Sequence, residues 1–152
     1  MKVREIMTSD VVVVTPETSV NTVAQRMGKG SISGVPVVDA AGRVVGIVSE
    51  LDLILRNARF EPPAFFQILD GRIPLETPAH YRKRLRHMLG TEARDVMTEE
   101  VVTVGPDEEV ESLADLMVRK RVNPIPVIEG GRLVGIVSRA DIIRMMARDL
   151  AD

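Results

Sequence analysis

Short apolar runs alternate with polar segments along the chain, and their spacing predicts both strands and helices. Residues 11–14 read VVVV, a β-branched run typical of a strand, and Pro16 ends it. Thr18 or Ser19 can cap the helix that follows. Its apolar positions show the i, i+3, i+4, i+7 spacing of one buried helical face: Val20, Val23, Ala24 and Met27. The glycines of GKG at 28–30 predict the end of this helix.

Two further apolar runs predict a hairpin and a second helix. VPVV at 35–38 and RVVGIVS at 43–49 flank the turn sequence DAAG, as the two strands of a hairpin do. Leu51, Ile54 and Leu55 then lie at helical spacing. The predicted order is therefore β-α-β-β-α.

The same order is written a second time. A shift of 90 residues places residues 3–27 on 93–117 without a gap, and SGVPVVD on NPIPVIE. GIVSELD at 46–52 matches GIVSRAD at 135–141 with a shift of 89, because the second hairpin turn, EGG, is one residue shorter. The second copy predicts helices at 108–119 and 139–148. Units of this size are small for independent cores, so we expect the two copies to pack as a pseudo-twofold pair that shares one core.

These features resemble a tandem pair of CBS domains, the family named for cystathionine β-synthase. The resemblance rests on the MT…VVTV.P opening, the h-P-h-h strand and the G-h-V-S-x-x-D ending, each present twice. It implies a mixed α/β (α+β) fold with repeat 1 at 1–55, a 37-residue connector containing a helix at 56–92, and repeat 2 at 93–152. It also implies a Bateman module that forms a disc-like homodimer and binds adenine nucleotides in clefts between its repeats.

Each repeat ends in Ser-x-x-Asp: Ser49 with Asp52, and Ser138 with Asp141. One interpretation is structural, because a serine N-cap and a carboxylate three residues later form a capping box. The other is ligand binding, because a helix N-terminus favours phosphate and a carboxylate can accept hydrogen bonds from ribose hydroxyls. The resemblance gives the matching Asp that ribose role in nucleotide-binding relatives. The sequence leaves both interpretations open.

The resemblance also implies which residues form the two adenine sites, each facing the Ser-x-x-Asp of the other repeat. Site A would consist of Met7, Val12, Ile32, Gly34, Val35, Ser138, Arg139 and Asp141. Site B would consist of Met97, Val102, Val122, Pro124, Ile125, Ser49 and Asp52. For each apolar member taken alone, core packing is the simpler explanation.

Two differences between the sites lead us to expect site A to be the stronger. Gly34 has no Cβ, so a ring could approach its backbone, whereas its counterpart Pro124 has no N–H to donate. Arg139 could contact a phosphate, whereas Glu50 at the matching position would repel one. Arg139 could equally be a solvated helix residue.

The connector at 56–92 has no counterpart in the second repeat. It holds all three phenylalanines, the only tyrosine and four of the nine prolines, so we expect an ordered but irregular segment. Within YRKRLRHMLG, one predicted helical face carries Tyr81, Leu85, Met88 and Leu89. The basic residues Arg82, Lys83, Arg84 and Arg86 lie elsewhere. Either this helix packs on the module or its dimer mate, or its basic surface meets a polyanion or the phosphates of a ligand.

Composition narrows the possible functions. The chain has no cysteine, which excludes disulfides, Cys-ligated metals and thiol nucleophiles. His80 and His87 have no fixed carboxylate partner, so we expect no metal. The sequence lacks a transmembrane-length apolar run and a signal peptide pattern, which predicts a soluble cytoplasmic protein without a membrane partner. Since no Walker, G-x-G-x-x-G, HExxH or nucleophile–base pattern is present, we expect no enzyme activity, no catalytic residue and no required cofactor.

Three hypotheses for the function remain. The leading one is a stand-alone sensor that binds AMP, ADP or ATP, or else S-adenosylmethionine, NAD or a cyclic dinucleotide, and signals to an unknown protein partner. The second is a structural dimerisation module whose clefts stay empty and whose Ser-x-x-Asp pairs are only caps. The third is a regulator that reads nucleic acid through the basic helix, which the net charge of −2 does not favour.

Overall fold

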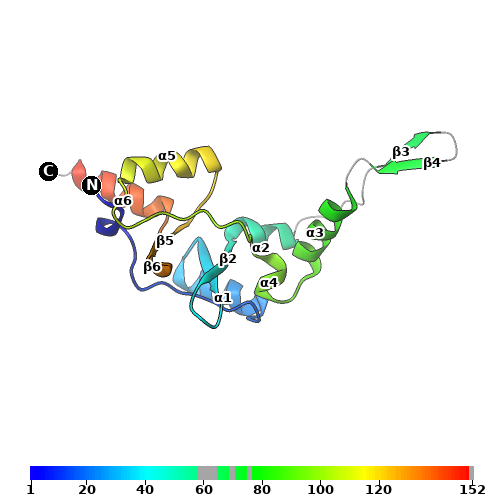
Figure 1. The fold of residues 1–152 in the computed structure, drawn as a ribbon, viewed down its shortest axis with the longest axis horizontal. Coiled ribbons are helices and arrows are strands. Elements are labelled where there is room, and N and C mark those ends of the chain that lie inside the picture. The colour runs from blue at the N-terminus through cyan, green and yellow to red at the C-terminus, as the bar shows by residue number, and fades with distance from the viewer. Residues whose placement is uncertain (58–64, 69–70, 75–76, 151–152) are drawn as a thin grey trace.

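The computed structural model describes residues 1–57, 65–68, 71–74 and 77–150, and it shows two equivalent α/β repeats (Figure 1). Repeat 1 contains α1 (Val20–Gly30), β1 (Gly34–Val38), β2 (Val44–Ser49) and α2 (Glu50–Asn57). Repeat 2 contains α5 (Val110–Lys120), β5 (Ile125–Glu129), β6 (Arg132–Val137) and α6 (Arg139–Asp149). A short helix precedes each repeat, η1 (Val3–Glu5) and α4 (Ala93–Val96). Between the repeats lie β3 (Phe65–Ile68), β4 (Gly71–Pro74) and α3 (Pro78–Leu89). The predicted mixed fold of paired repeats is confirmed.

Each repeat has one antiparallel hairpin, and the two hairpins have the same register. Val35 pairs with Val48 in the first, and Ile125 pairs with Val137 in the second. All four side chains are fully buried, as expected for the inward face of a strand. The branched apolar residues of each hairpin therefore belong to the core of their own repeat.

The strand predicted at 11–14 is reduced to one parallel bridge. Val14 donates its N–H to the Pro36 carbonyl at 3.0 Å and accepts from the Val38 N–H at 2.9 Å. Residues 11–13 leave the edge of the hairpin, and Val12 is exposed. The prediction was too long because an apolar run that borders a cavity reads like a strand.

The helices follow the predicted pattern with small differences at their ends. Ser19 is the N-cap of α1 and accepts the Thr22 N–H at 3.1 Å. The buried face consists of Val20, Val23 and Met27, whereas Ala24 is exposed, so the prediction was wrong at that position. The helix continues to Gly30 because Ser31, rather than a glycine, adopts the left-handed conformation with φ of 50°. No helix in the described part of the chain is long and apolar enough to cross a membrane.

In repeat 2, α5 begins at Val110 and not at the predicted residue 108. Glu108 instead closes the preceding turn, where its carboxylate accepts the Gly105 N–H at 2.7 Å. Its own N–H donates to the Gly105 carbonyl at 3.3 Å. A residue held in this way stays outside the helix.

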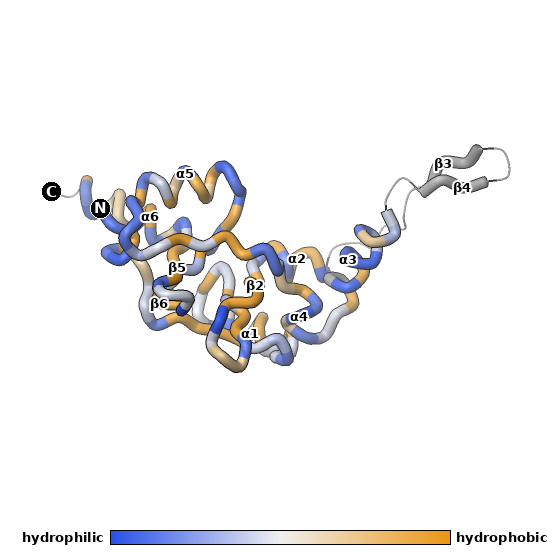
Figure 2. The backbone as a smooth tube through the Cα atoms, viewed as in Figure 1, coloured by the Kyte–Doolittle hydropathy of each residue, from blue (hydrophilic) through white to orange (hydrophobic). Residues whose placement is uncertain are grey.

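Each repeat is completed by the short helix that precedes the other repeat (Figure 1). Ala93 and Val96 of α4 are fully buried in the core of repeat 1, and Val3 of η1 is fully buried in the core of repeat 2. The backbone supports the exchange, since Ala93 donates to Thr18 at 2.8 Å. Figure 2 shows the apolar residues running through both hairpins. The expectation of one shared core was wrong: the described residues form two cores, and the exchanged helices hold the repeats together.

The repeated glycine of GIVS makes room for the repeated methionine of the Met-Thr pair. Thr98 and Ile47 exchange two backbone hydrogen bonds of 2.8 and 3.0 Å between the repeats. This pairing lays Met97 over Gly46, where an added Cβ would overlap the Met97 side chain. The other half repeats the arrangement with Met7, Thr8, Gly135 and Ile136. The paired motifs are therefore two halves of one contact.

The connector contains the predicted helix and also a hairpin that was not predicted. Helix α3 packs against α2 and α4, and the β3–β4 hairpin lies beyond it, away from both repeats (Figure 1). Tyr81 and Leu85 are half-buried as expected. Leu89 is 73% exposed, and Arg84 is half-buried with its guanidinium 5.6 Å from the centre of the Tyr81 ring, so both were assigned to the wrong face. Outside the described residues lie Phe60 and the side chains of Phe65, Phe66, His87 and Met88.

Candidate ligand-binding site

The larger of two neighbouring cavities, cavity A, has a volume of about 520 Å³ and brings most of the predicted site A together. Ser138 and Asp141 of repeat 2 line it opposite Val12, Ile32 and Gly34 of repeat 1. Further lining residues that the sequence did not single out include Thr8, Asp10, Val11, Ser31, Ser33, Asn123, Ile136 and Arg144. The cavity therefore belongs to both repeats.

Cavity B has a volume of about 460 Å³ and corresponds to site B. Ser49 and Asp52 of repeat 1 line it opposite Val102, Val122 and Pro124 of repeat 2. The pattern is the same as in cavity A with the roles of the repeats exchanged. Residues that the sequence missed here include Ile47, Thr98, Glu100, Val101 and Arg121.

Four predicted members do not line either cavity. Val35 and Ile125 are fully buried in the two cores. Val35 follows Gly34 in β1, and successive strand residues point to opposite faces, so only Gly34 borders the cavity. Met7 and Met97 pack on the glycines of GIVS. The adjacent threonines, Thr8 and Thr98, line the cavities in their place.

The Ser-x-x-Asp pairs cap the helices that follow them. Asp141 Oδ2 accepts the Ser138 N–H at 2.6 Å and the Ser138 hydroxyl at 2.8 Å. Asp52 Oδ2 accepts the same two groups of Ser49 at 2.8 and 3.0 Å. Both aspartates are only 7% exposed. The capping interaction therefore uses only one oxygen, Oδ2, of each carboxylate.

The second oxygen of each carboxylate has a different partner. Asp141 Oδ1 forms an ion pair with Arg144, whose side chain is 60% exposed. Asp52 Oδ1 accepts the Thr98 hydroxyl at 3.5 Å. A carboxylate offers about four lone-pair positions, and the cap uses those of Oδ2 alone. Capping and ligand binding are therefore compatible in this geometry.

The sequence suggested that Gly34 leaves room for a ligand ring, but in the structure this space is already filled. A Cβ on Gly34 would lie 2.6 Å from Cδ of Pro124 and 3.0 Å from the Val48 carbonyl oxygen. The space is filled because the two equivalent residues meet where the repeats face each other. The glycine admits the proline of the other repeat.

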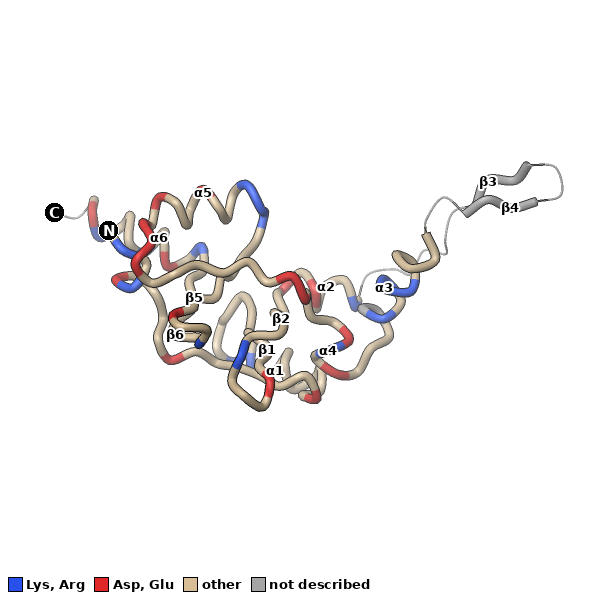
Figure 3. Tube along the Cα trace, in the orientation of Figure 1, with Lys and Arg blue, Asp and Glu red and all other residues tan. Residues whose placement is uncertain are grey.

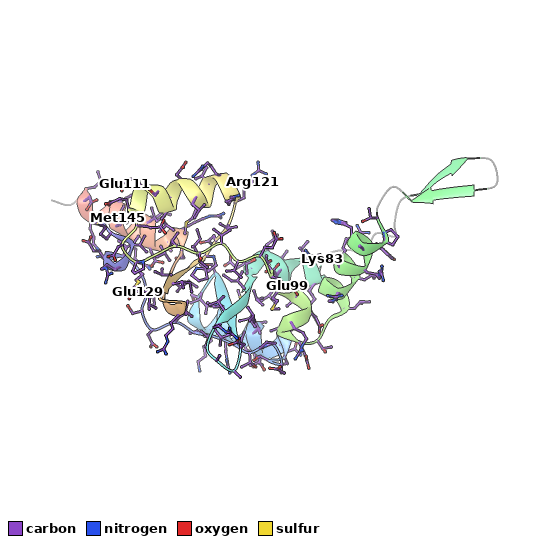
Figure 4. The ribbon with its side chains drawn as sticks, in the orientation of Figure 1. Lys83, Glu99, Glu111, Arg121, Glu129 and Met145 are labelled. Atoms are coloured by element: carbon purple, nitrogen blue, oxygen red, sulfur yellow. The ribbon has the colours of Figure 1, made fainter. Side chains whose placement is uncertain are left out.

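Charged side chains of both signs line the two cavities. Cavity A has Arg139 and Arg144 with Asp10, Glu50 and Asp141. Cavity B has Arg121 and Arg139 with Glu50, Asp52 and Glu100. Arg139 lines cavity A, where the sequence placed it, and it borders cavity B as well, as does Glu50. Arg121, at the end of α5, is labelled in Figure 4.

A third cavity, of about 320 Å³, lies beside the connector helix α3. Four cations line it together with two carboxylates: Arg82, Lys83, Arg86 and Arg94, with Asp95 and Glu99. Figure 3 shows the basic residues along α3, and Lys83 and Glu99 are labelled in Figure 4. Arg94 is also paired with Glu17 at 2.8 Å and with Glu92 at 2.9 Å. The basic face of α3 is thus partly balanced by neighbouring carboxylates.

The CBS domain family matches the chain twice, at residues 3–58 and 93–148. The chain belongs to the CBS-domain family. It is a tandem CBS pair, as the sequence motifs predicted. The uncharacterized protein MJ1426 of Methanocaldococcus jannaschii is 30% identical over 156 residues, which cover 96% of this chain and 91% of that protein.

Two solved CBS structures show the same fold over nearly the whole chain. The structure of CBSX2 in complex with AMP has a TM-score of 0.79 at 24% identity and covers 97% of both chains. The CBS domain pair of protein MJ0100, in complex with 5-methylthioadenosine and S-adenosyl-L-methionine, has a TM-score of 0.72 at 22% identity and covers 98% of both. At these identities the likeness concerns the fold.

Proposed function

We propose that this CBS pair is a regulatory module that binds an adenosine-containing ligand in cavities A and B and transmits occupancy to a protein partner. One observation carries the proposal: each cavity joins the Ser-x-x-Asp of one repeat to apolar residues of the other. A ligand held there would contact both repeats and so alter how they pack together. The adenosine compounds bound by CBSX2 and MJ0100 support this ligand class.

The side chains of cavity A suit the parts of a nucleotide. Val12 and Ile32 offer apolar surface to a base, and Asp141 Oδ1 can accept hydrogen bonds from ribose hydroxyls. Arg144 now occupies that oxygen, but its exposed side chain is free to turn toward a phosphate. A volume of about 520 Å³ lies within the usual range for small-molecule sites.

Cavity A remains the stronger site in this proposal, on different grounds from those the sequence offered. It is the larger cavity, and Arg144 lies directly beside the Asp141 carboxylate. The corresponding residue of repeat 1 is Leu55, which carries no charge. A phosphate next to the ribose would therefore have a nearby cation in cavity A.

We further propose that the module forms a homodimer through α2 and α6. Ile54 and Ile143 hold equivalent positions in these helices and are 63% and 64% exposed. Leu51 and Met146 extend the apolar surface. Equivalent patches on two pseudo-symmetric helices give a self-complementary surface, as an isologous interface requires. A second copy of the chain is the simplest partner for it.

The alternative is a dimerisation module with unused clefts. The capping bonds favour it, since they give each Ser-x-x-Asp a structural role without any ligand. Nothing in either cavity requires catalytic chemistry, and we propose no reaction for the protein. Binding measurements separate the two functions.

Calorimetric titration of the wild type and single variants with AMP, adenosine, 5-methylthioadenosine and S-adenosylmethionine tests the proposal. Asp141→Asn keeps an acceptor for the cap but presents an amide to the ribose, and we expect it to weaken binding about tenfold or more. Asp52→Asn should weaken the tightest binding less. Asp115→Asn is the control, because Asp115 pairs with Arg119 on α5 and lines neither cavity. A ligand affinity that changes in neither Asp141→Asn nor Asp52→Asn would contradict the assigned site.

A further inference from the structure

Cavities A and B share a wall. Four residues line both of them: Glu50, Asn123, Pro124 and Arg139. Glu50 directly follows Ser49, and Arg139 directly follows Ser138, so they are equivalent residues of opposite charge. The wall therefore contains one cation that can face a ligand in either cavity.

The backbone fixes both charged residues at this wall. Arg139 donates its N–H to Asn123 Oδ1 at 2.9 Å. Glu50 donates its N–H to the Ser33 carbonyl at 3.0 Å, and Ser33 is the counterpart of Asn123. Both side chains are exposed. The Arg139 guanidinium can thus reach toward either cavity on its flexible stem, but it can serve only one at a time.

The other charged residues of each cavity determine what happens in the cavity toward which Arg139 does not point. Without Arg139, the described residues of cavity A set Arg144 against three carboxylates, Asp10, Glu50 and Asp141. Those of cavity B set Arg121 against Glu50, Asp52 and Glu100. Each cavity would then carry a formal charge of −2 (one cation minus three anions). A phosphate entering the cavity that lacks Arg139 meets repulsion, whereas an uncharged nucleoside does not.

We infer that Arg139 is a phosphate-binding residue shared by the two clefts, so that a phosphorylated ligand in one lowers the affinity of the other for a second. An uncharged nucleoside fills both clefts independently. The inference rests on the proposed function and adds a stoichiometry to it. At ligand concentrations between the two dissociation constants, each chain binds one phosphorylated ligand. In such a module the number of filled clefts depends on the ligand: one for a phosphorylated ligand and two for an uncharged nucleoside.

Titration calorimetry with AMP and with adenosine tests the inference on the full chain. AMP should bind in two steps per chain, and occupancy of the first cleft should lower the affinity of the second, beyond any intrinsic difference between the clefts, by a coupling factor in the range of about 5- to 150-fold. Adenosine should fill two clefts per chain without coupling. In Asp52→Asn, which weakens cleft B, the second AMP step should weaken further, which assigns that step to cleft B.

Arg139→Gln separates the shared cation from other causes. The first AMP step should weaken about tenfold, the coupling factor should fall toward one, and adenosine binding should stay unchanged. Arg132→Gln is the matched control, because Arg132 is an exposed arginine of β6 that lines neither cavity. Since both arginines are exposed, thermal melts of the two variants should match the wild type.

Three results would overturn the inference while leaving the proposed function standing. These are equal AMP affinity at both clefts, adenosine binding that also stops at one per chain, and coupling that persists in Arg139→Gln. If neither AMP nor adenosine binds, the proposed function is wrong and the inference falls with it.

Discussion

Gly34 and Pro124 occupy equivalent positions in the two repeats and contact each other, with the Cβ position of Gly34 only 2.6 Å from Pro124 Cδ. The contact lies at the wall between the cavities, because Pro124 lines both of them. The glycine–proline difference between the repeats, which the sequence linked to ligand binding, therefore allows the two repeats to pack against each other.

Gly34→Ala should destabilise the protein by about 1–3 kcal/mol, because the new methyl group meets the proline ring and the Val48 carbonyl with no room to move. Urea unfolding measures the free energy change. Gly28→Ala in α1 is the control: apart from its chain neighbours and the nearby backbone of its own helix, no described atom lies within 4 Å of its Cβ position, so it should stabilise the helix by about 0.5–1 kcal/mol. Equal effects of the two variants would argue against the contact.

Gly46→Ala should destabilise the protein less when Met97 is also shortened to alanine. The Cβ at residue 46 overlaps the Met97 side chain, so the double variant should show a coupling energy of about 0.5–3 kcal/mol. Met7→Ala supplies the matched control, because Met7 packs on Gly135 in the other half and should be additive with Gly46→Ala. Denaturant unfolding of the three single and two double variants, with the wild type, measures both cycles; a coupling with Met7 as large as that with Met97 would contradict the pairing.

Asp39 should stabilise the β1–β2 turn in a pH-dependent way. The Arg43 N–H, with help from the Ala41 N–H, lowers the pKa of Asp39; both donate to Oδ1 at 2.9 Å. Because the folded pKa is lower, the stabilisation is complete above the unfolded pKa of about 3.9 and is lost as the pH falls through the folded value. Asp39→Asn should therefore be less stable than the wild type at neutral pH and nearly equal to it in strong acid.

Unfolding titrations at both pH values test this prediction. Glu129→Gln, at the equivalent turn position of repeat 2, serves as the control. Among the described residues, the Glu129 carboxylate accepts a hydrogen bond from the Arg4 side chain at 3.4 Å but none from a backbone N–H. A stability gap between Asp39→Asn and the wild type that does not change with pH would show that the carboxylate charge has no part in it.

If the proposed homodimer forms through α2 and α6, the double variant Ile54→Glu, Ile143→Glu should convert it to a folded monomer. Both side chains are exposed in the single chain, so charges there should disturb an intersubunit contact without opening a core. Sedimentation equilibrium measures the mass, and circular dichroism checks the fold. Val118→Glu, at an exposed position of α5, should leave the dimer intact. A monomeric wild type would rule out this interface.

The sequence was sufficient for the local elements and their pairing, because each depends on a short pattern. The repeat of GIVS with its serine and aspartate predicted the two equivalent hairpins and the helices that follow them, and the resemblance to CBS pairs implied that each Ser-x-x-Asp faces the other repeat. The exchange that buries Val3 and Ala93 in opposite cores could not be predicted, since periodicity shows that a residue is buried but not which residues surround it.

The errors in the candidate site have two physical sources. Gly34 and Val35 were both placed in the cleft, although strand alternation allows only one of two neighbours to face it, so the signal to correct this was present in the sequence. Arg144 and Arg121 were missed because they lie outside the repeated motifs and their counterparts, Leu55 and Ser31, carry no charge.

The central claim is that an adenosine-containing ligand binds between the repeats, and a thermal melt with a ligand panel tests it most directly. The panel contains adenosine, AMP, ADP, ATP, NAD, S-adenosylmethionine, 5-methylthioadenosine and a cyclic dinucleotide. At 100 times its Kd, a true ligand should add about 2.7 kcal/mol of stability and raise Tm, and the double variant Asp52→Asn, Asp141→Asn should lose the shift. A panel without any shift, or a shift that survives in the double variant, would contradict the account.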